Sequence, residues 1–177
     1  MTVLVASDYA GLWRRTLLVN ADGSRDTGTD VTWLQGPTAY VDSRGFAGTL
    51  GVGGDVFEWH RDIDLEPQGS LPDAGRMAWD GDTLVETGIH ENYVEHWVRD
   101  GGPSSPCGAR FLRAPDGSPG LLVRVGALFG WAGGGVVVID TVGGARWQAL
   151  GIGCFENQVQ ANGARWAVDR TEGDIDT

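Results

Sequence analysis

The chain has 177 residues, with 13 basic and 24 acidic side chains that give a formal charge of −11 at pH 7. This length accommodates one domain and is short for two. The acidic balance argues against nucleic acid as a partner and against a polybasic membrane anchor, because both need a basic surface. All 13 basic residues are arginines, so Schiff-base and P-loop chemistry that depends on lysine is excluded.

The beginning of the sequence lacks the basic segment and apolar run of a signal peptide. No apolar run approaches the roughly 20 residues that span a bilayer. We therefore expect a cytoplasmic protein without membrane contact. Cys107 and Cys154 are then expected to be free thiols, because disulfides rarely persist in the cytosol.

Turn-forming pairs divide the chain into short β-prone segments. Asp-Gly or Asn-Gly pairs, which favour the tight turns of hairpins, begin at positions 22, 80, 100, 116 and 162. No stretch of 12 residues carries the apolar stripe of an amphipathic helix. The sequence predicts strands, in chain order, at Leu12–Val19, Val31–Gln35, Thr38–Asp42, Phe46–Val52, Val56–Leu65, Arg76–Trp79, Thr83–Ile89, Tyr93–Arg99, Arg110–Arg113, Leu121–Phe129, Val136–Asp140, Arg146–Leu150, Phe155–Gln160 and Arg165–Val168.

Sequential hairpins favour an all-β fold, a single antiparallel up-and-down β-barrel of about ten strands, because closure removes the exposed edges of a sheet. We expect one domain over 1–177, with residues 1–8 and 171–177 peripheral and residues 101–106 spanning one barrel end. Barrels of about eight to ten strands can hold one small ligand. The eight tryptophans, distributed along the whole chain, fit either a sheet core or the aromatic walls of such a cavity.

Alternation along the strand around Trp59 places an arginine among apolar side chains. One face carries Phe57, Trp59, Arg61 and Ile63 and is expected to point inward, with His60 on the solvated face. An inward arginine needs a partner or an anionic ligand, because a buried unpaired charge is costly. Arg61 is therefore interpreted either as a mouth residue stacked on a tryptophan or as a ligand-binding arginine.

The first predicted strand repeats this arrangement. One of its faces carries Trp13, Arg15, Leu17 and Val19. Arg15 therefore shares a face with Trp13, and it is expected either to stack on a neighbouring ring or to contact a ligand.

The segment 86–96 contains the densest set of acid–base groups. Glu86, His90 and His96 would form a two-His, one-carboxylate metal set if they met across a hairpin, but a hairpin with charged outer residues explains them better, and no metal site is assigned. If His96 points inward, it is either a general base or a hydrogen-bonded core histidine.

Motifs of known enzymes are missing from the sequence. It contains no Gly-x-Ser-x-Gly elbow, Cys-x-x-Cys pair, P-loop or dinucleotide fingerprint. The glycine-rich run at 130–135 lacks a lysine and a following helix pattern, so it is interpreted as a loop or bulge. A serine hydrolase or a cysteine-nucleophile enzyme is therefore not indicated.

Gly11-Leu12-Trp13 resembles the Gly-x-Trp signature of lipocalin-like (calycin) barrels. In that superfamily the tryptophan closes one barrel end and an arginine from another strand packs across it. The resemblance implies this role for Trp13, with Arg165 as one option for the arginine. A longer pattern between Leu12 and Trp59, which includes Asp22-Gly23-Ser24 and Tyr40-Val41-Asp42-Ser43-Arg44, is similar to the poorly characterised fungal casein-kinase-interacting proteins of lipocalin-like fold and their bacterial relatives. This resemblance implies a fold and no particular reaction.

The first functional hypothesis is a binding protein that holds a small apolar or aromatic molecule in a tryptophan-lined barrel, with an arginine meeting an acidic group of the ligand. The residues expected to contact this ligand are Trp13, Arg15, Trp33, Tyr40, Phe57, Trp59 and Arg61.

The alternative is a cofactor-free isomerase, cyclase or lyase in the same barrel. His96, Glu86 or Tyr93 would act as acid or base, and Arg61 would stabilise developing negative charge. A third hypothesis is an inert protein-interaction module with a filled barrel. No cofactor is expected, although haem ligated by one of the three histidines (60, 90 and 96) is an option. The sequence leaves open whether two copies of the chain form a homodimer.

Overall fold

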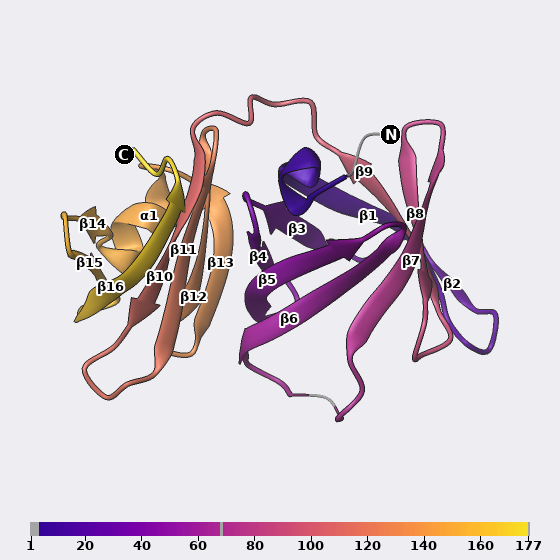
Figure 1. The fold of residues 1–177 in the computed structure, drawn as a ribbon, viewed down its shortest axis with the longest axis horizontal. Helices are drawn as coiled ribbons and strands as arrows, with labels where there is room; N and C mark the ends of the chain where they lie inside the picture. The colour runs from indigo at the N-terminus through magenta and orange to yellow at the C-terminus, as the bar shows by residue number, and fades with distance from the viewer. Residues whose placement is uncertain (1–3, 68, 177) are drawn as a thin grey trace.

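The computed structural model describes residues 4–67 and 69–176, which form two antiparallel β-sheets (Figure 1). The first sheet contains the strands β1 (Gly11–Val19), β2 (Arg25–Asp26), β3 (Thr32–Gln35), β4 (Ala39–Asp42), β5 (Phe46–Gly53), β6 (Val56–Asp64), β7 (Asp73–Asp80), β8 (Thr83–Gly88) and β9 (Val94–Arg99). A short 3₁₀ helix, η1 (Ala6–Tyr9), precedes β1.

The first sheet closes into a barrel because β1 pairs with β3 on one side and with β9 on the other. Between them, each strand pairs with the next one along the chain, which is the up-and-down order that the hairpin turns predict. β2 is an additional short strand at the end of β1. The all-β antiparallel barrel is confirmed, and it closes with eight strands, fewer than expected.

The second sheet contains β10 (Cys107–Arg113), β11 (Pro119–Val125), β12 (Leu128–Gly133), β13 (Val136–Thr141), β14 (Gly153–Cys154), β15 (Gln158–Ala161) and β16 (Ala164–Gly173). Its order, β13-β12-β11-β10-β16-β15-β14, gives a curved half-barrel. The helix α1 (Ala145–Leu150) covers its face that points away from the barrel (Figure 1).

The two sheets share an apolar core. The outer face of β3 and β4 contributes Leu34 and Val41, which pack against Leu121 and Val123 of β11. The sheets approach closely where Gly130 faces the barrel, since a Cβ there would lie 2.8 Å from Cγ2 of Val41. The two parts of the chain are thus in direct apolar contact.

Two sequence expectations about the second half of the chain are wrong. Residues 101–106 connect the barrel to the second sheet and do not span the end of a single barrel (Figure 1). Residues 146–150 belong to α1 and not to a strand, because Gly144 and Gly151 delimit one short helix and Gly151 adopts the left-handed conformation at its end.

The expected peripheral segments contribute to the cores at two points. Ala6, at the start of η1, is buried in the barrel core, and Ile175 is buried against the outer face of the second sheet. Cys107 and Cys154 are both free thiols, as expected. No helix among the described residues is long and apolar enough to cross a membrane.

Candidate functional site

One end of the barrel is closed by η1 and by the side chain of Trp13. The indole Nε1 of Trp13 donates a 2.8 Å hydrogen bond to the carbonyl oxygen of Tyr9, and the guanidinium of Arg99 lies 4.9 Å from the Trp13 ring centroid. A Cβ on Gly11 would lie 2.9 Å from Cδ of Arg99, so this position needs glycine. The closing arginine is therefore Arg99 and not Arg165, which lies in the second sheet on β16.

Aromatic rings fill the barrel above this closed end. Trp13 stacks on Trp33 at 5.3 Å, and Tyr9 meets Phe57 edge to face at 4.6 Å. Trp13, Phe57 and Tyr40 are fully buried in this core and do not line a cavity. Of the seven residues expected to contact a ligand, these three are part of the packed core instead.

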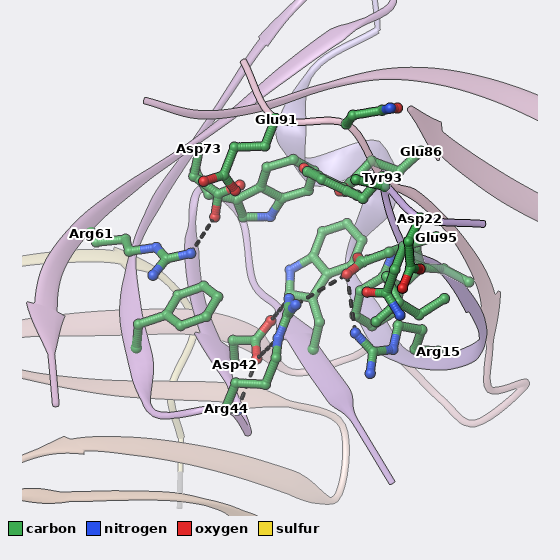
Figure 2. A pocket seen from close by; sticks show the side chains of 18 residues that line it. Arg15, Asp22, Asp42, Arg44, Arg61, Asp73, Glu86, Glu91, Tyr93 and Glu95 are labelled. Carbon is green, nitrogen blue, oxygen red and sulfur yellow. Dashed lines mark hydrogen bonds and ion pairs between the residues drawn. The ribbon is translucent and has the colours of Figure 1, made fainter. Parts of the chain in front are cut away.

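The other end of the barrel is open and contains a cavity of about 660 Å³ (Figure 2). The remaining four expected contact residues, Arg15, Trp33, Trp59 and Arg61, line it. Aromatic walls come from Trp33, Trp59, Trp97 and Phe46, whereas the polar lining includes six carboxyl groups and three arginines. This cavity is the candidate functional site.

Two β-bulges decide which side chains enter the cavity. In β1 the register against β9 shifts between Arg15 and Leu17, so Arg15 and Leu18 point inward and Leu17 does not. In β6 the register against β5 shifts after Arg61, so Ile63 packs outside, in the core shared by the two sheets. The expected inward position of Ile63 is therefore wrong, and Leu17 does not share a face with Arg15, because the extra residue of each bulge reverses the alternation.

A chain of ion pairs crosses one wall of the cavity (Figure 2), and its side chains are buried except that of Arg44, which is 36% exposed. Glu95 Oε1 accepts hydrogen bonds from Arg15 and from Arg44, each at 3.1 Å, and Arg44 also pairs with Asp42 at 2.8 Å. Trp97 Nε1 donates to the second oxygen of Glu95 at 3.1 Å. We call Arg15, Glu95, Arg44 and Asp42 the inner ion-pair chain, in which two positive charges balance two negative charges.

One donor of the inner ion-pair chain has no acceptor. The Arg15 side chain is 6% exposed, and its Nε is buried without a hydrogen-bond partner among the described residues. Its other two nitrogens donate to Glu95 and to Thr29. A buried donor left unpaired destabilises a protein, so the inner ion-pair chain is held at some cost in stability.

Glu86 and Tyr93 are a second group of polar side chains on the cavity wall. Two glycines opposite each other in the ladder make room for them: a Cβ on Gly75 would lie 2.5 Å from Cγ of Glu86, and one on Gly88 would lie 2.5 Å from the Tyr93 ring. Burial and then the neighbouring Glu95 raise the pKa of Glu86 well above its usual range. Burial, with the charge of Glu86, also raises the pKa of Tyr93.

Arg61 lies at the mouth of the cavity and is held by two carboxylates. It pairs with Asp73 at 2.7 Å and with Asp64 at 3.1 Å, and its guanidinium lies 3.6 Å from the Phe46 ring centroid. Arg61 therefore lies at the mouth and stacks on Phe46, and not on a tryptophan as expected.

The structure does not bring the histidines into the cavity. His96 alternates on β9 with the inward Glu95 and Trp97, so it points outward, and an inward general base at this position is ruled out. His60 and His90 are exposed. No cluster of metal-binding side chains occurs in residues 4–67 and 69–176, and Glu86 is separated from both His90 and His96.

Sequence reasoning missed Arg44, Asp42 and Glu95. A usable signal was present for Glu95, because it shares a strand face with Trp97, and an inward tryptophan implies an inward residue two positions before it. Arg44 lies in the turn between β4 and β5, where no alternation indicates its direction.

We compared the chain with protein-family models, with curated proteins and with solved structures, and none of the three comparisons gave a match.

Proposed function

We propose that this protein is a lipocalin-like barrel that binds a small aromatic or apolar molecule in the cavity at its open end. The observation that carries this proposal is the cavity itself, which has a volume of about 660 Å³ and walls formed by Trp33, Trp59, Trp97 and Phe46. Small-molecule sites in proteins typically have volumes of about 300–1,000 Å³, aromatic walls and a few fixed polar groups. A filled, inert barrel would have no such space.

The closed end supports the lipocalin-like assignment. A tryptophan on the first barrel strand, an arginine from the last one packed over it and a glycine two residues earlier reproduce the arrangement that the Gly-x-Trp resemblance implies. Within the proposal, Arg15, which lines the cavity and is held by Glu95, supplies one of the fixed polar groups of its wall.

A second candidate function is acid–base catalysis on a ligand in the same cavity. One observation favours it: Glu86 is buried at the cavity wall, which Tyr93 also lines, and its pKa is raised. A carboxyl group that stays protonated near neutral pH can act as a general acid. Because His96 points outward, Glu86 and Tyr93 are the two residues left from the expected acid–base set for the enzyme hypothesis.

Native mass spectrometry, compared with the denatured mass of the same sample, tests the binding proposal. We expect an extra mass in the native spectrum that disappears on denaturation. The variant Trp59→Leu changes the cavity wall and should lose this mass, whereas Trp79→Leu should keep it. Trp79 is the matched control because it lies on the adjacent strand β7, is 50% exposed and does not line the cavity.

Equal retention of the extra mass by both variants would place the ligand elsewhere on the protein. A native mass equal to that of the chain or a simple multiple of it would instead favour a weakly bound substrate. In that case, turnover by the wild type and its loss in Glu86→Gln and Tyr93→Phe would support the enzyme hypothesis.

A further inference from the structure

The charges around the cavity are unevenly distributed. Six carboxyl groups line it, at positions 22, 42, 73, 86, 91 and 95, against the three arginines 15, 44 and 61. Every one of these arginines already pairs with at least one carboxylate. The cavity therefore offers no strong site for an additional anion, and its excess charge is negative, as is that of the whole chain.

Glu86 is the buried carboxyl without an arginine. Glu86 is 4% exposed, and none of the ion pairs among the described residues includes it. The inner ion-pair chain is already balanced, so it has no cation to spare for Glu86. A buried carboxylate without a cation costs several kcal/mol, and the group therefore carries a proton while the cavity is empty.

The groups that face Glu86 come from every element packed around it. Glu95 is its direct partner across β8 and β9, and Tyr93 precedes β9. Asp73 from β7 opposes ionisation of Glu86, whereas Arg44 from the turn between β4 and β5 favours it. Met77 is its uncharged partner on β7. Glu95 and Asp73 are both acidic, and Arg44 already pairs with Asp42 and Glu95. No positive charge is therefore left to balance an ionised Glu86.

We infer that the ligand of this cavity is an organic cation, an aromatic or apolar molecule whose ammonium group binds at Glu86 beside Tyr93. This inference rests on the proposed function, since it names the class of molecule that the cavity binds. The ammonium supplies the missing positive charge, and the carboxylates of Asp22, Asp73 and Glu91 at the open end attract a cation toward the cavity. Trp33 and Trp59 also line this cavity, and aromatic rings attract cations.

Binding is coupled to proton release. The protonated Glu86 gives its proton to the buffer, and the resulting carboxylate forms an ion pair with the ammonium of the ligand, so charge is conserved. Affinity for a cation therefore rises with pH until Glu86 is ionised in the free protein. A neutral or anionic ligand that accepts a hydrogen bond from the protonated Glu86 would show the opposite pH dependence.

Isothermal titration calorimetry with three probes of matched shape tests the inference: 2-(1-naphthyl)ethylamine, 2-(1-naphthyl)ethanol and 1-naphthylacetate. We expect the amine to bind at least about tenfold more tightly than the other two, because only the amine pairs with a buried carboxylate. Repeating the titration in phosphate and in Tris, which differ in ionisation enthalpy, should reveal release of a proton with the amine and none with the alcohol.

The variant Glu86→Gln keeps the shape of the side chain over Gly75 and removes its charge. It should lose about tenfold or more in affinity for the amine and bind the alcohol as the wild type does. Glu156→Gln makes the same substitution at an exposed position in the second half of the chain and should bind the amine as the wild type does. Thermal unfolding of both variants checks that they are folded.

The outcomes separate the inference from the proposed function. Tighter binding of the alcohol or the acetate, or loss of amine affinity in Glu91→Gln but not in Glu86→Gln, would overturn the inference and leave the binding cavity intact. No heat of binding with any of the three probes at millimolar concentration would overturn both.

Discussion

Replacing Glu95 with glutamine tests whether the inner ion-pair chain holds the cavity wall together. Arg44 would keep its pair with Asp42, but Arg15 has no second carboxylate within ion-pair distance among the described residues. Both Arg15 and Glu95 are nearly inaccessible to water, with side chains 6% and 5% exposed. Breaking a buried ion pair from one side costs about 3–5 kcal/mol. We expect about 3 kcal/mol, because the glutamine oxygen still accepts one hydrogen bond.

Urea unfolding followed by tryptophan fluorescence measures this loss. With a slope of about 2 kcal/mol/M, the midpoint of Glu95→Gln should fall by about 1.5 M. Arg15→Met should cost only about 1 kcal/mol, because Glu95 retains Arg44 and Trp97 as partners. The exposed pair of Arg14 and Asp100 supplies the control, and Arg14→Met should cost less than about 1 kcal/mol.

Two results would refute this reasoning: a larger loss in Arg15→Met than in Glu95→Gln, or a loss in Glu95→Gln no greater than that in Arg14→Met. The series should also be measured in the Glu86→Gln background. Removing the charge of Glu95 lowers the pKa of Glu86, because the repulsion between the two carboxylates disappears. The loss of this repulsion offsets part of the expected decrease in stability.

Three further predictions concern other parts of the molecule. Because the pKa of Glu86 is raised in the folded state, the folded protein binds the extra proton, and its stability should fall relative to that of Glu86→Gln as pH rises above the usual glutamate range; urea unfolding between pH 4 and 8 measures this difference. Arg99→Met removes the cation over Trp13 and two hydrogen bonds to backbone carbonyls, and it should lower the thermal midpoint by roughly 3–6 °C. Glu172→Gln weakens the hydrogen bonds that residues 38–39 donate to the side chain of Glu172 on β16, and it should speed amide hydrogen exchange at these residues by about tenfold.

Each of these predictions has an outcome that contradicts it. Parallel pH profiles for the wild type and Glu86→Gln would show that the carboxyl is not forced to stay protonated. Arg165→Met is the control for Arg99→Met, since Arg165 is exposed in the second sheet, and equal midpoints for the two variants would contradict the closing role of Arg99. Unchanged exchange at residues 38–39 in Glu172→Gln would mean that the two sheets are held together by their apolar core alone.

Local sequence patterns predicted the strands and the barrel because hairpin turns and alternation depend on neighbouring residues. They did not predict where the barrel closes, since the pairing of β1 with β9 joins segments about 80 residues apart. The strands of the second sheet have the same alternation and turns as those of the barrel, so the pattern does not separate the two sheets. The short helix α1 was also missed, because six residues between glycines carry too little periodicity.

Local alternation also predicted part of the candidate site, and it failed where a bulge or a long-range pairing decides the direction of a side chain. Arg15 and Trp59 were placed correctly because they precede the bulges in their strands, whereas Ile63 follows one and faces the opposite way. The partner of Arg15 is Glu95, 80 positions away, and only the closed sheet brings them together. The direction of His96 could not be deduced from alternation alone, because alternation gives two faces without saying which one is inside.

The central claim is that the open end of the barrel binds a small molecule. The indole N–H signals of ¹⁵N-labelled protein, titrated with 2-(1-naphthyl)ethylamine, test it most directly, because the tryptophans are distributed over both sheets. We predict that the signals of Trp33, Trp59 and Trp97 shift, while those of the three tryptophans in the second half of the chain stay in place. Shifts confined to the second half of the chain, or no shifts at all, would contradict the account.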